Sequence, residues 1–309
     1  MAVYLFPGQG SQAVGMGRDL YDQYAEVREL YDHAEATLGY DLAAISFEGP
    51  EERLRQTQVT QPALFVHSLA LSTLLREQGL LPEATAGHSL GEYSAVVSAG
   101  AVDFAEALEV VKVRGLEMSR AAAQAPGAMV ALLGASEEQI QALCQNGPEG
   151  GVVVPANLNA PGQVVLSGDA EAVANAARAA RTMGLRRVIP LNVSGAFHSP
   201  LMAAAKAALG AALDKMSLRD PQVPVYQNVT ARASRSAEEI KANLLQQLES
   251  PVRWEETMRQ LWTEGFREFY EVGSGKVLLG LNRRILPEAF TLSLSTVQDV
   301  RQLGVPATG

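Results

Sequence analysis

The strongest constraint on the fold is the pentapeptide Gly87-His88-Ser89-Leu90-Gly91, in which two glycines flank a serine at the spacing of a nucleophile elbow. In an elbow a strand ends, the chain turns sharply and a helix begins, so that the serine hydroxyl is exposed at the tip. The glycines allow the neighbouring backbone to approach closely. The free N–H groups and the positive dipole end of the helix favour an oxyanion beside the serine. A chain that uses this motif must therefore place a strand before it and a helix after it.

The residues around the motif favour an elbow over a chance occurrence in a glycine-containing loop. An apolar helix is expected over residues 62–78, and a short apolar segment precedes the motif. Residues 92–97 form a helix start with an acid in the first turn and no proline. The order helix, strand, elbow, helix is the setting that this chemistry requires.

Hydrophobic patterning in the outer parts of the chain predicts an α/β fold. Short apolar strands alternate with helices there, at residues 3–6, 224–229 and, as the final strand, 269–272. This alternation predicts a mainly parallel sheet covered on both faces. The tail from Val297 shows little pattern. We therefore expect a large α/β-hydrolase-like domain, made of residues 1–123 and 195–309, that carries the elbow.

Residues 124–194 have a different pattern. Their expected strands and helices follow in the order βαββαβ, at residues 129–133, 137–145, 152–157, 163–167, 170–183 and 187–193. This is the order of the split, ferredoxin-like unit. We therefore expect a small ferredoxin-like domain inserted into the large one. The turn at residues 157–162 joins two of its strands and is expected to face the cleft.

Composition excludes several classes of function. A formal net charge of −9 argues against a general nucleic-acid binder, and no apolar run is long enough to cross a membrane. The N-terminus starts with an apolar strand and lacks the basic region of a signal peptide. The single cysteine, Cys144, excludes an intramolecular disulfide and favours a reducing, cytoplasmic location. No His, Cys, Asp or Glu cluster has metal-ligand spacing, so no metal is expected.

A serine hydroxyl needs a base near neutral pH, and the sequence has four histidines. His33 and His67 lie within helical patterns and are interpreted as packing residues. His88 neighbours Ser89, and adjacent side chains on such a turn tend to diverge. His198 lies in a small-residue loop where a strand ends, the usual place for a functional group in an α/β fold. Elimination therefore favours His198, although a capping or turn histidine remains the alternative, and no acid stands out as the third group.

Two further features have both a structural and a functional interpretation. The loop Gly8-Gln9-Gly10 can point backbone N–H groups inward, as an oxyanion site requires, or can be a plain strand-to-helix turn. Arg114 recurs at helical spacing with apolar residues that include Met118. Because a buried charge needs a partner, Arg114 is either a snorkelling or internally paired side chain, or a cation in a cleft that awaits an anionic ligand.

Together these motifs resemble those of malonyl-CoA:acyl carrier protein transacylases, the acyltransferase family of bacterial fatty-acid synthesis. The resemblance covers roughly residues 3–285 and rests on separated motifs that occur in order. They are residues 6–12, 60–64, 87–92, 114–118, 157–163, 197–199, 247–254 and 271–278.

The resemblance implies roles for the matching residues. Ser89 would take the malonyl group as an ester, with His198 as base and then acid. Backbone N–H groups of Gln9 and Leu90 would form the oxyanion hole. Arg114 would bind the free carboxylate of malonate as a bidentate pair.

Further residues are implied around this centre. Gln247 would lie beside His198 and supply a carbonyl that orients it, in agreement with the missing acid. The other substrate-binding residues implied are Met118, Asn157 and Phe197. The bulky residues after the serine and before the histidine, Leu90 and Phe197, resemble those of members that prefer malonyl over methylmalonyl.

The implied partners are malonyl-CoA and phosphopantetheinylated acyl carrier protein, with no cofactor. The size and the self-contained pattern favour a monomer. The acidic carrier would need a local basic patch, for which the candidates are Arg178, Arg181, Arg186, Arg187, Arg283 and Arg284. Two alternatives remain: a serine esterase or thioesterase, which needs no carboxylate clamp, and a non-catalytic carrier-protein docking module.

Overall fold

A computed structural model describes residues 2–145 and 151–304 and contains a large and a small sheet. The large sheet has the strand order β10-β9-β1-β2-β7-β8. Its strands are β1 (Ala2–Phe6), β2 (Ala84–Gly87), β7 (Val225–Tyr226), β8 (Ala233–Ser234), β9 (Glu268–Val272) and β10 (Phe290–Leu294). All neighbouring strands are parallel except the pair β7 and β8. The expected α/β fold with a mainly parallel sheet is confirmed.

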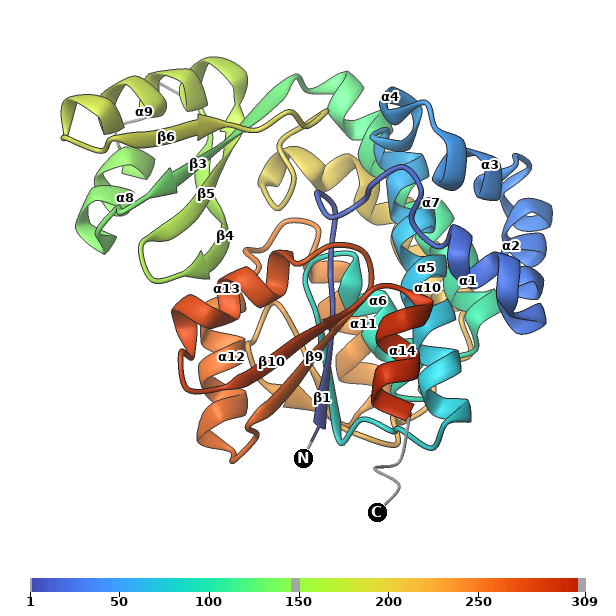
Figure 1. The fold of residues 1–309 in the computed structure, drawn as a ribbon. Coiled ribbons are helices and arrows are strands. Elements are labelled where there is room, and N and C mark those ends of the chain that lie inside the picture. Colours follow the sequence, from blue (N-terminus) through green and yellow to red (C-terminus); the bar gives the residue numbers. More distant parts are fainter. Residues whose placement is uncertain (1, 146–150, 305–309) are drawn as a thin grey trace.

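Helices cover both faces of the large sheet (Figure 1). The helices of this part of the molecule, some of which pack only on other helices, are α1 (Arg18–Gln23), α2 (Ala25–Leu38), α3 (Leu42–Glu48), α4 (Glu51–Leu54), α5 (Thr57–Glu77), α6 (Gly91–Ser98), α7 (Phe104–Gln124), the 3₁₀ helix η1 (Pro200–Ala205), α10 (Lys206–Lys215), α11 (Ala237–Gln246), α12 (Trp254–Thr263), α13 (Val277–Ile285) and α14 (Val297–Gly304). Alternation along β1 explains the two layers, because successive strand side chains point to opposite faces. Val3 and Leu5 pack with α12 and α13, whereas Tyr4 and Phe6 pack with the layer that contains α5 and α7. Within residues 2–145 and 151–304, no helix is both long and apolar enough to span a membrane.

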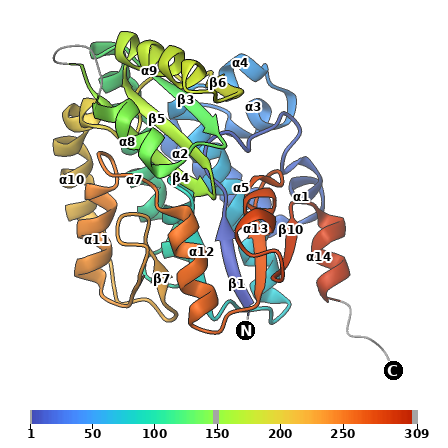
Figure 2. The same ribbon diagram turned by 90° about the vertical axis from the view of Figure 1, so that its left-hand side faces the viewer.

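The small sheet is antiparallel and has the strand order β4-β5-β3-β6. Its elements are β3 (Gly127–Leu133), α8 (Glu137–Gln145), β4 (Val153–Ala160), β5 (Gln163–Asp169), α9 (Ala170–Thr182) and β6 (Arg187–Pro190). The order of elements and the strand order are those of a ferredoxin-like unit, as the sequence predicts. Figures 1 and 2 show this unit above one end of the large sheet. Backbone hydrogen bonds of 2.9 Å join the two parts, from Leu158 N to Val252 O and from Val252 N to Ala156 O.

The prediction that residues 269–272 form the final strand is wrong. The later strand β10 pairs in parallel with β9 at the edge of the sheet, and α14 follows it. In β10 the apolar residues Phe290 and Leu292 are exposed while the polar Ser293 is buried, which is the reverse of the usual pattern of burial. An edge strand with exposed apolar residues gives no clear amphipathic signal.

The expected helix at residues 62–78 begins earlier, at Thr57, and includes Pro62 in its interior. Proline has no N–H and leaves the carbonyl four residues before it without a helical partner. Here that carbonyl belongs to Gln58, and the hydroxyl of Tyr40 donates to it at 3.2 Å. A side chain from the connection between α2 and α3 thus replaces the missing bond, which local sequence cannot reveal.

The strand expected at residues 224–229 is only two residues long. The chain leaves the sheet at Gln227, because Gln227 Nε2 and Asn228 N donate to the carboxylate of Glu92. The backbone N–H of Asn228 thus bonds to a carboxylate and not to a neighbouring strand, and both contacts bring Asn228 to the elbow.

His67 lies in the interior of α5, fully buried, as the packing interpretation expects. Neither of its ring nitrogens has a hydrogen-bond partner among the residues that the structure describes. Burial lowers the pKa of His67 to about 4. The folded protein therefore binds this proton less readily than the unfolded chain, and His67 lowers stability as the pH falls below about 6.5.

We expect the variant His67→Leu to gain stability relative to the original protein as the medium becomes acidic. The gain should be about 2 kcal/mol larger at pH 5 than at pH 8, since only the original protein must keep His67 neutral. Urea unfolding of both proteins at both pH values measures this difference. An equal stability difference at pH 5 and pH 8 would show that His67 is not held neutral.

Candidate active site

The elbow is built as the sequence predicts, with Ser89 between the end of β2 and the start of α6. Ser89 has a positive φ of 52°, in the left-handed region that non-glycine residues rarely adopt. A Cβ atom on Gly87 would lie 1.9 Å from the carbonyl carbon of Gly91, and one on Gly91 would lie 2.0 Å from Phe6 O. Both positions therefore require glycine.

Asn228 holds the elbow in this strained conformation. Its Oδ1 accepts a hydrogen bond of 2.7 Å from Ser89 N, and its Nδ2 donates to Gly87 O at 2.6 Å. One side chain thus satisfies backbone groups on both sides of the turn. Such a clamp offsets part of the cost of the left-handed serine.

Ser89, His198 and Gln247 form a hydrogen-bonded chain. Ser89 Oγ lies 2.8 Å from His198 Nε2, and His198 Nδ1 lies 2.9 Å from the backbone oxygen of Gln247. Since a carbonyl can only accept, Nδ1 carries the proton and Nε2 presents its lone pair to the serine hydroxyl. Burial, together with the positive charge of Arg114, lowers the pKa of His198 to about 3. The imidazole is therefore neutral near pH 7 and able to accept a proton.

Arg114 projects from α7 and is 1% exposed. Its Nη1 donates to Gln61 Oε1 at 2.7 Å, and its Nη2 donates to Gln247 Oε1 at 2.9 Å and to Ser89 Oγ at 3.2 Å. Among the residues that the structure describes, the acceptors of these hydrogen bonds are all neutral oxygens. Burial lowers the pKa of Arg114 and leaves its charge without full compensation. A carboxylate that entered the pocket would supply that compensation.

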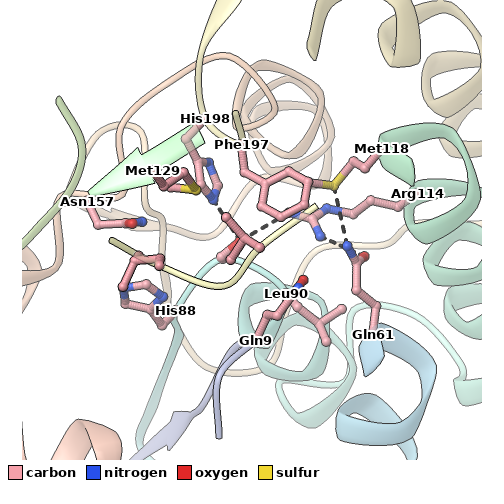
Figure 3. A pocket seen from close by; sticks show the side chains of 13 residues that line it. Gln9, Gln61, His88, Leu90, Arg114, Met118, Met129, Asn157, Phe197 and His198 are labelled. Atoms are coloured by element: carbon pink, nitrogen blue, oxygen red, sulfur yellow. Dashed lines mark hydrogen bonds between the residues drawn. The ribbon is translucent and has the colours of Figure 1, made fainter. Parts of the chain in front are cut away.

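The serine, the histidine and the arginine meet in a pocket of about 90 Å³, and Figure 3 shows His198, Phe197 and Arg114 on its wall. Both parts of the molecule form the wall. The lining residues are Gln9, Gln61, His88, Ser89, Leu90, Arg114, Met118, Met129, Asn157, Leu191, Val193, Phe197 and His198.

Gln9 and Leu90 lie on this wall, one in the loop after β1 and the other directly after the serine. Neither backbone N–H has a hydrogen-bond acceptor among residues 2–145 and 151–304. Unpaired backbone donors beside a nucleophile are what an oxyanion site needs.

A model of the acyl transferase domain family matches residues 3–292. The chain belongs to the acyl transferase family. The malonyl CoA-acyl carrier protein transacylase of Bacillus subtilis is 44% identical over 307 residues, which cover 96% of this chain and 97% of that protein. An acyl carrier protein S-malonyltransferase from Vibrio cholerae is 42% identical, with a TM-score of 0.93 over 98% of this chain and 99% of that one. A malonyl-transacylase in complex with a type II PKS acyl-carrier protein is 40% identical, with a TM-score of 0.92 over 97% of this chain and 98% of that one.

These similarities confirm the resemblance that the sequence motifs indicate. In this acyl transferase, eight residues that the sequence analysis selects lie on the pocket wall: Gln9, Ser89, Leu90, Arg114, Met118, Asn157, Phe197 and His198. Gln247 does not lie on the wall. It is fully buried behind the pocket, where its side chain contacts Arg114 and its backbone oxygen contacts His198.

Sequence reasoning missed three polar residues of this acyl transferase site. Gln61 accepts from Arg114, Asn228 clamps the elbow, and Glu92 accepts hydrogen bonds beneath it. Gln61 and Glu92 fall within motifs of the resemblance, and this was the available signal. Asn228 lies at the end of a short apolar segment and gave no signal of its own.

His88 turns away from the serine hydroxyl, as its neighbouring position suggests. Its Nε2 lies 2.8 Å from Asn159 Oδ1 on β4, so it links the elbow of the large part to the small sheet. Burial lowers the pKa of His88, and a neutral ring suits this contact.

In this acyl transferase, the described residues include no group of three or more His, Cys, Asp and Glu side chains placed to hold a metal ion.

Proposed function

We propose that this chain transfers the malonyl group of malonyl-CoA to the phosphopantetheine thiol of acyl carrier protein through a malonyl ester of Ser89. The observation that carries the proposal is the pair of contacts on one oxygen. Ser89 Oγ lies 2.8 Å from His198 Nε2 and 3.2 Å from Arg114 Nη2. A nucleophile and its base thus share the pocket with a buried cation that would pair with a carboxylate. The names of the relatives support the same acyl group and carrier.

In the first half-reaction, His198 Nε2 takes the hydroxyl proton as Ser89 Oγ attacks the thioester carbonyl carbon of malonyl-CoA. The π electrons move to the carbonyl oxygen, to which the backbone N–H groups of Gln9 and Leu90 would donate. When the tetrahedral intermediate collapses, the C–S bond breaks and the CoA sulfur leaves with the proton from His198. A malonyl ester and a neutral imidazole remain.

The second half-reaction uses the same groups in reverse, which makes the mechanism ping-pong. His198 Nε2 takes the proton of the phosphopantetheine thiol, and the sulfur attacks the ester carbonyl carbon. Collapse of the second intermediate breaks the bond to Ser89 Oγ, which regains its proton from His198. The backbone oxygen of Gln247 holds the tautomer that both steps need.

Arg114 would select the acyl group. Its guanidinium can pair with the free carboxylate of malonate in a bidentate manner, which lysine cannot reproduce. An acetyl group would leave this buried cation unpaired, and a site of this kind rejects such a ligand. Leu90 and Phe197 line the pocket and, as bulky residues, would favour malonyl over methylmalonyl. Met118 and Asn157 would line the space beside the acyl group.

We place the small domain at residues 124–194 and the large domain at residues 1–123 and 195–309. The chain would act as a monomer in the cytoplasm, in fatty-acid biosynthesis. Exposed arginines on and next to α9, β6 and α13 would meet the acidic carrier: Arg178, Arg181, Arg186, Arg187, Arg283 and Arg284.

The test is a transfer assay with malonyl-CoA and phosphopantetheinylated carrier protein, read from the mass of the carrier. We expect the carrier to gain one malonyl group. A serine hydrolase would release free malonate while the carrier stays unchanged, and a docking module would consume no malonyl-CoA. Either result would replace the proposed function.

The same assay in excess EDTA should give an unchanged rate. The imidazole and the backbone N–H groups supply proton transfer and oxyanion stabilisation without a Lewis acid. A loss of transfer that returns when a divalent cation is added would contradict this prediction.

A further inference from the structure

Glu92 is a fully buried carboxylate in the first turn of α6, behind the pocket wall. Three N–H groups donate to it: Gln247 Nε2 at 2.7 Å, Asn228 N at 3.0 Å and Gln227 Nε2 at 3.2 Å. All three contacts are donors, so the group must act as an acceptor, as a carboxylate does. Glu92 is absent from the pocket lining and takes no part in the steps described above.

Gln247 is the link between Glu92 and the pocket. Its Nε2 donates to Glu92 and to Ser89 O, at 2.7 and 3.0 Å, which leaves Oε1 to accept from Arg114 at 2.9 Å. A Gln247 amide turned by 180° would place its NH₂ against the guanidinium donors and its oxygen against the carboxylate. Both contacts would be repulsive. Glu92 therefore determines which end of this amide faces Arg114.

The charges of Glu92 and Arg114 favour the same arrangement as the hydrogen bonds. Burial raises the pKa of Glu92 to about 7, whereas the three hydrogen bonds and the charge of Arg114 oppose that rise. In turn, burial lowers the pKa of Arg114, and the charge of Glu92 opposes it. A buried anion and a buried cation thus compensate each other in part across a single amide side chain.

We propose that Glu92 is a positioning residue for acyl selection: it fixes the Gln247 side chain so that Oε1 holds the Arg114 guanidinium where a substrate carboxylate meets it. This inference rests on the proposed function. It predicts a selective effect, because His198 contacts the backbone oxygen of Gln247 and not its side chain. The backbone there is held by α11, through a 2.9 Å bond from Gln247 N to Asn243 O. The base should therefore stay in place when Glu92 is changed.

The test compares the ratio of kcat/KM for malonyl-CoA to that for acetyl-CoA at pH 8. Glu92→Met removes all three acceptor contacts at similar side-chain length, and the ratio should fall about 10- to 100-fold, as expected for one hydrogen bond to a charged group. Glu92→Gln keeps one acceptor oxygen and should give an intermediate ratio. It also serves as the measurement if the methionine variant does not fold. Acetyl transfer should fall less than malonyl transfer in both variants, because Asn228 N also loses or weakens its contact with Glu92 beside the elbow.

A double-mutant cycle separates positioning from a general loss of structure. In a Gln247→Ala background, Glu92→Met should change the ratio by less than about twofold, because the link is already absent. The matched control is Glu271→Met, which removes another fully buried carboxylate. Glu271 accepts hydrogen bonds from Leu278 N and Leu279 N at the start of α13, outside the pocket wall. The ratio of the two kcat/KM values should therefore stay unchanged in Glu271→Met.

The outcomes distinguish the inference from the function on which it rests. If the original protein transfers no malonyl group, the proposed function fails. If it does, but the Glu92 variants lower malonyl and acetyl transfer equally, Glu92 has only a structural role. An effect of Glu92→Met on the ratio that persists fully in the Gln247→Ala background would also overturn the inference.

Discussion

Replacing Ser89 with alanine is expected to abolish the covalent malonyl adduct and to reduce transfer by on the order of 10⁴-fold or more. The hydroxyl is the only group placed 2.8 Å from the His198 lone pair within the described chain, so no neighbour can accept the acyl group in its place. The measurement is intact mass after incubation with malonyl-CoA. The original protein should gain one malonyl group, and Ser89→Ala should gain none.

The control for Ser89→Ala is the loss of a buried hydroxyl elsewhere. Ser72 is buried in α5 and pairs with Ser98 Oγ at 2.9 Å, away from the pocket. Ser72→Ala should lose some stability and keep the adduct. A malonyl adduct that survives in folded Ser89→Ala would assign the acyl group to another residue and remove the mechanism proposed here.

Arg114→Ala should lower kcat/KM for malonyl-CoA by about 10²–10³-fold, the cost of removing one partner from a buried charge pair. Transfer of acetyl should rise relative to transfer of malonyl, because acetyl has no carboxylate to lose a partner. The ratio of the two kcat/KM values measures this change and does not depend on the fraction of protein that is folded. Competition between the two thioesters in one reaction gives the ratio directly.

Two further variants test whether the guanidinium itself is responsible. Arg114→Lys keeps the charge but has no planar pair of donors, so it should recover only part of the malonyl preference. Arg120→Ala removes an exposed arginine from the same helix, where it pairs with Glu117, and should leave the ratio unchanged. An unchanged malonyl preference in Arg114→Ala would show that another group binds the carboxylate.

Much of the fold follows from local sequence. The elbow needs two glycines at fixed spacing, and the contacts at Gly87 and Gly91 show why no side chain fits there. The small sheet follows from the order of short apolar segments and helices, whose side chains share one core. The errors arise where tertiary contacts decide the outcome. The hydroxyl of Tyr40 donates to the carbonyl that the proline of α5 leaves without a helical partner. The exposed apolar residues of β10 give this strand no amphipathic pattern.

The site is harder to predict, because its residues lie far apart in the chain. Ser89 and His198 are 109 positions apart, and only the folded chain brings them into contact. Elimination among four histidines selects the correct neighbour of the serine. The backbone oxygen of Gln247 is invisible to such reasoning, since any residue type carries one. Asn228 acts on backbone groups of the elbow rather than on the pocket, so its role has no pattern in sequence, and Glu92 was marked only by its place in a motif.

Ser89 and His198 share an uncommon backbone conformation, with positive φ values of 52° and 56°. Each costs about 1 kcal/mol or more relative to an ordinary conformation, and glycine would remove most of that cost. At these two positions, therefore, a substitution that raises thermal stability would lower the rate of catalysis. A library selected only for heat resistance would drift toward glycine at both and lose the reacting groups, so stability screens of this chain need a simultaneous selection for activity.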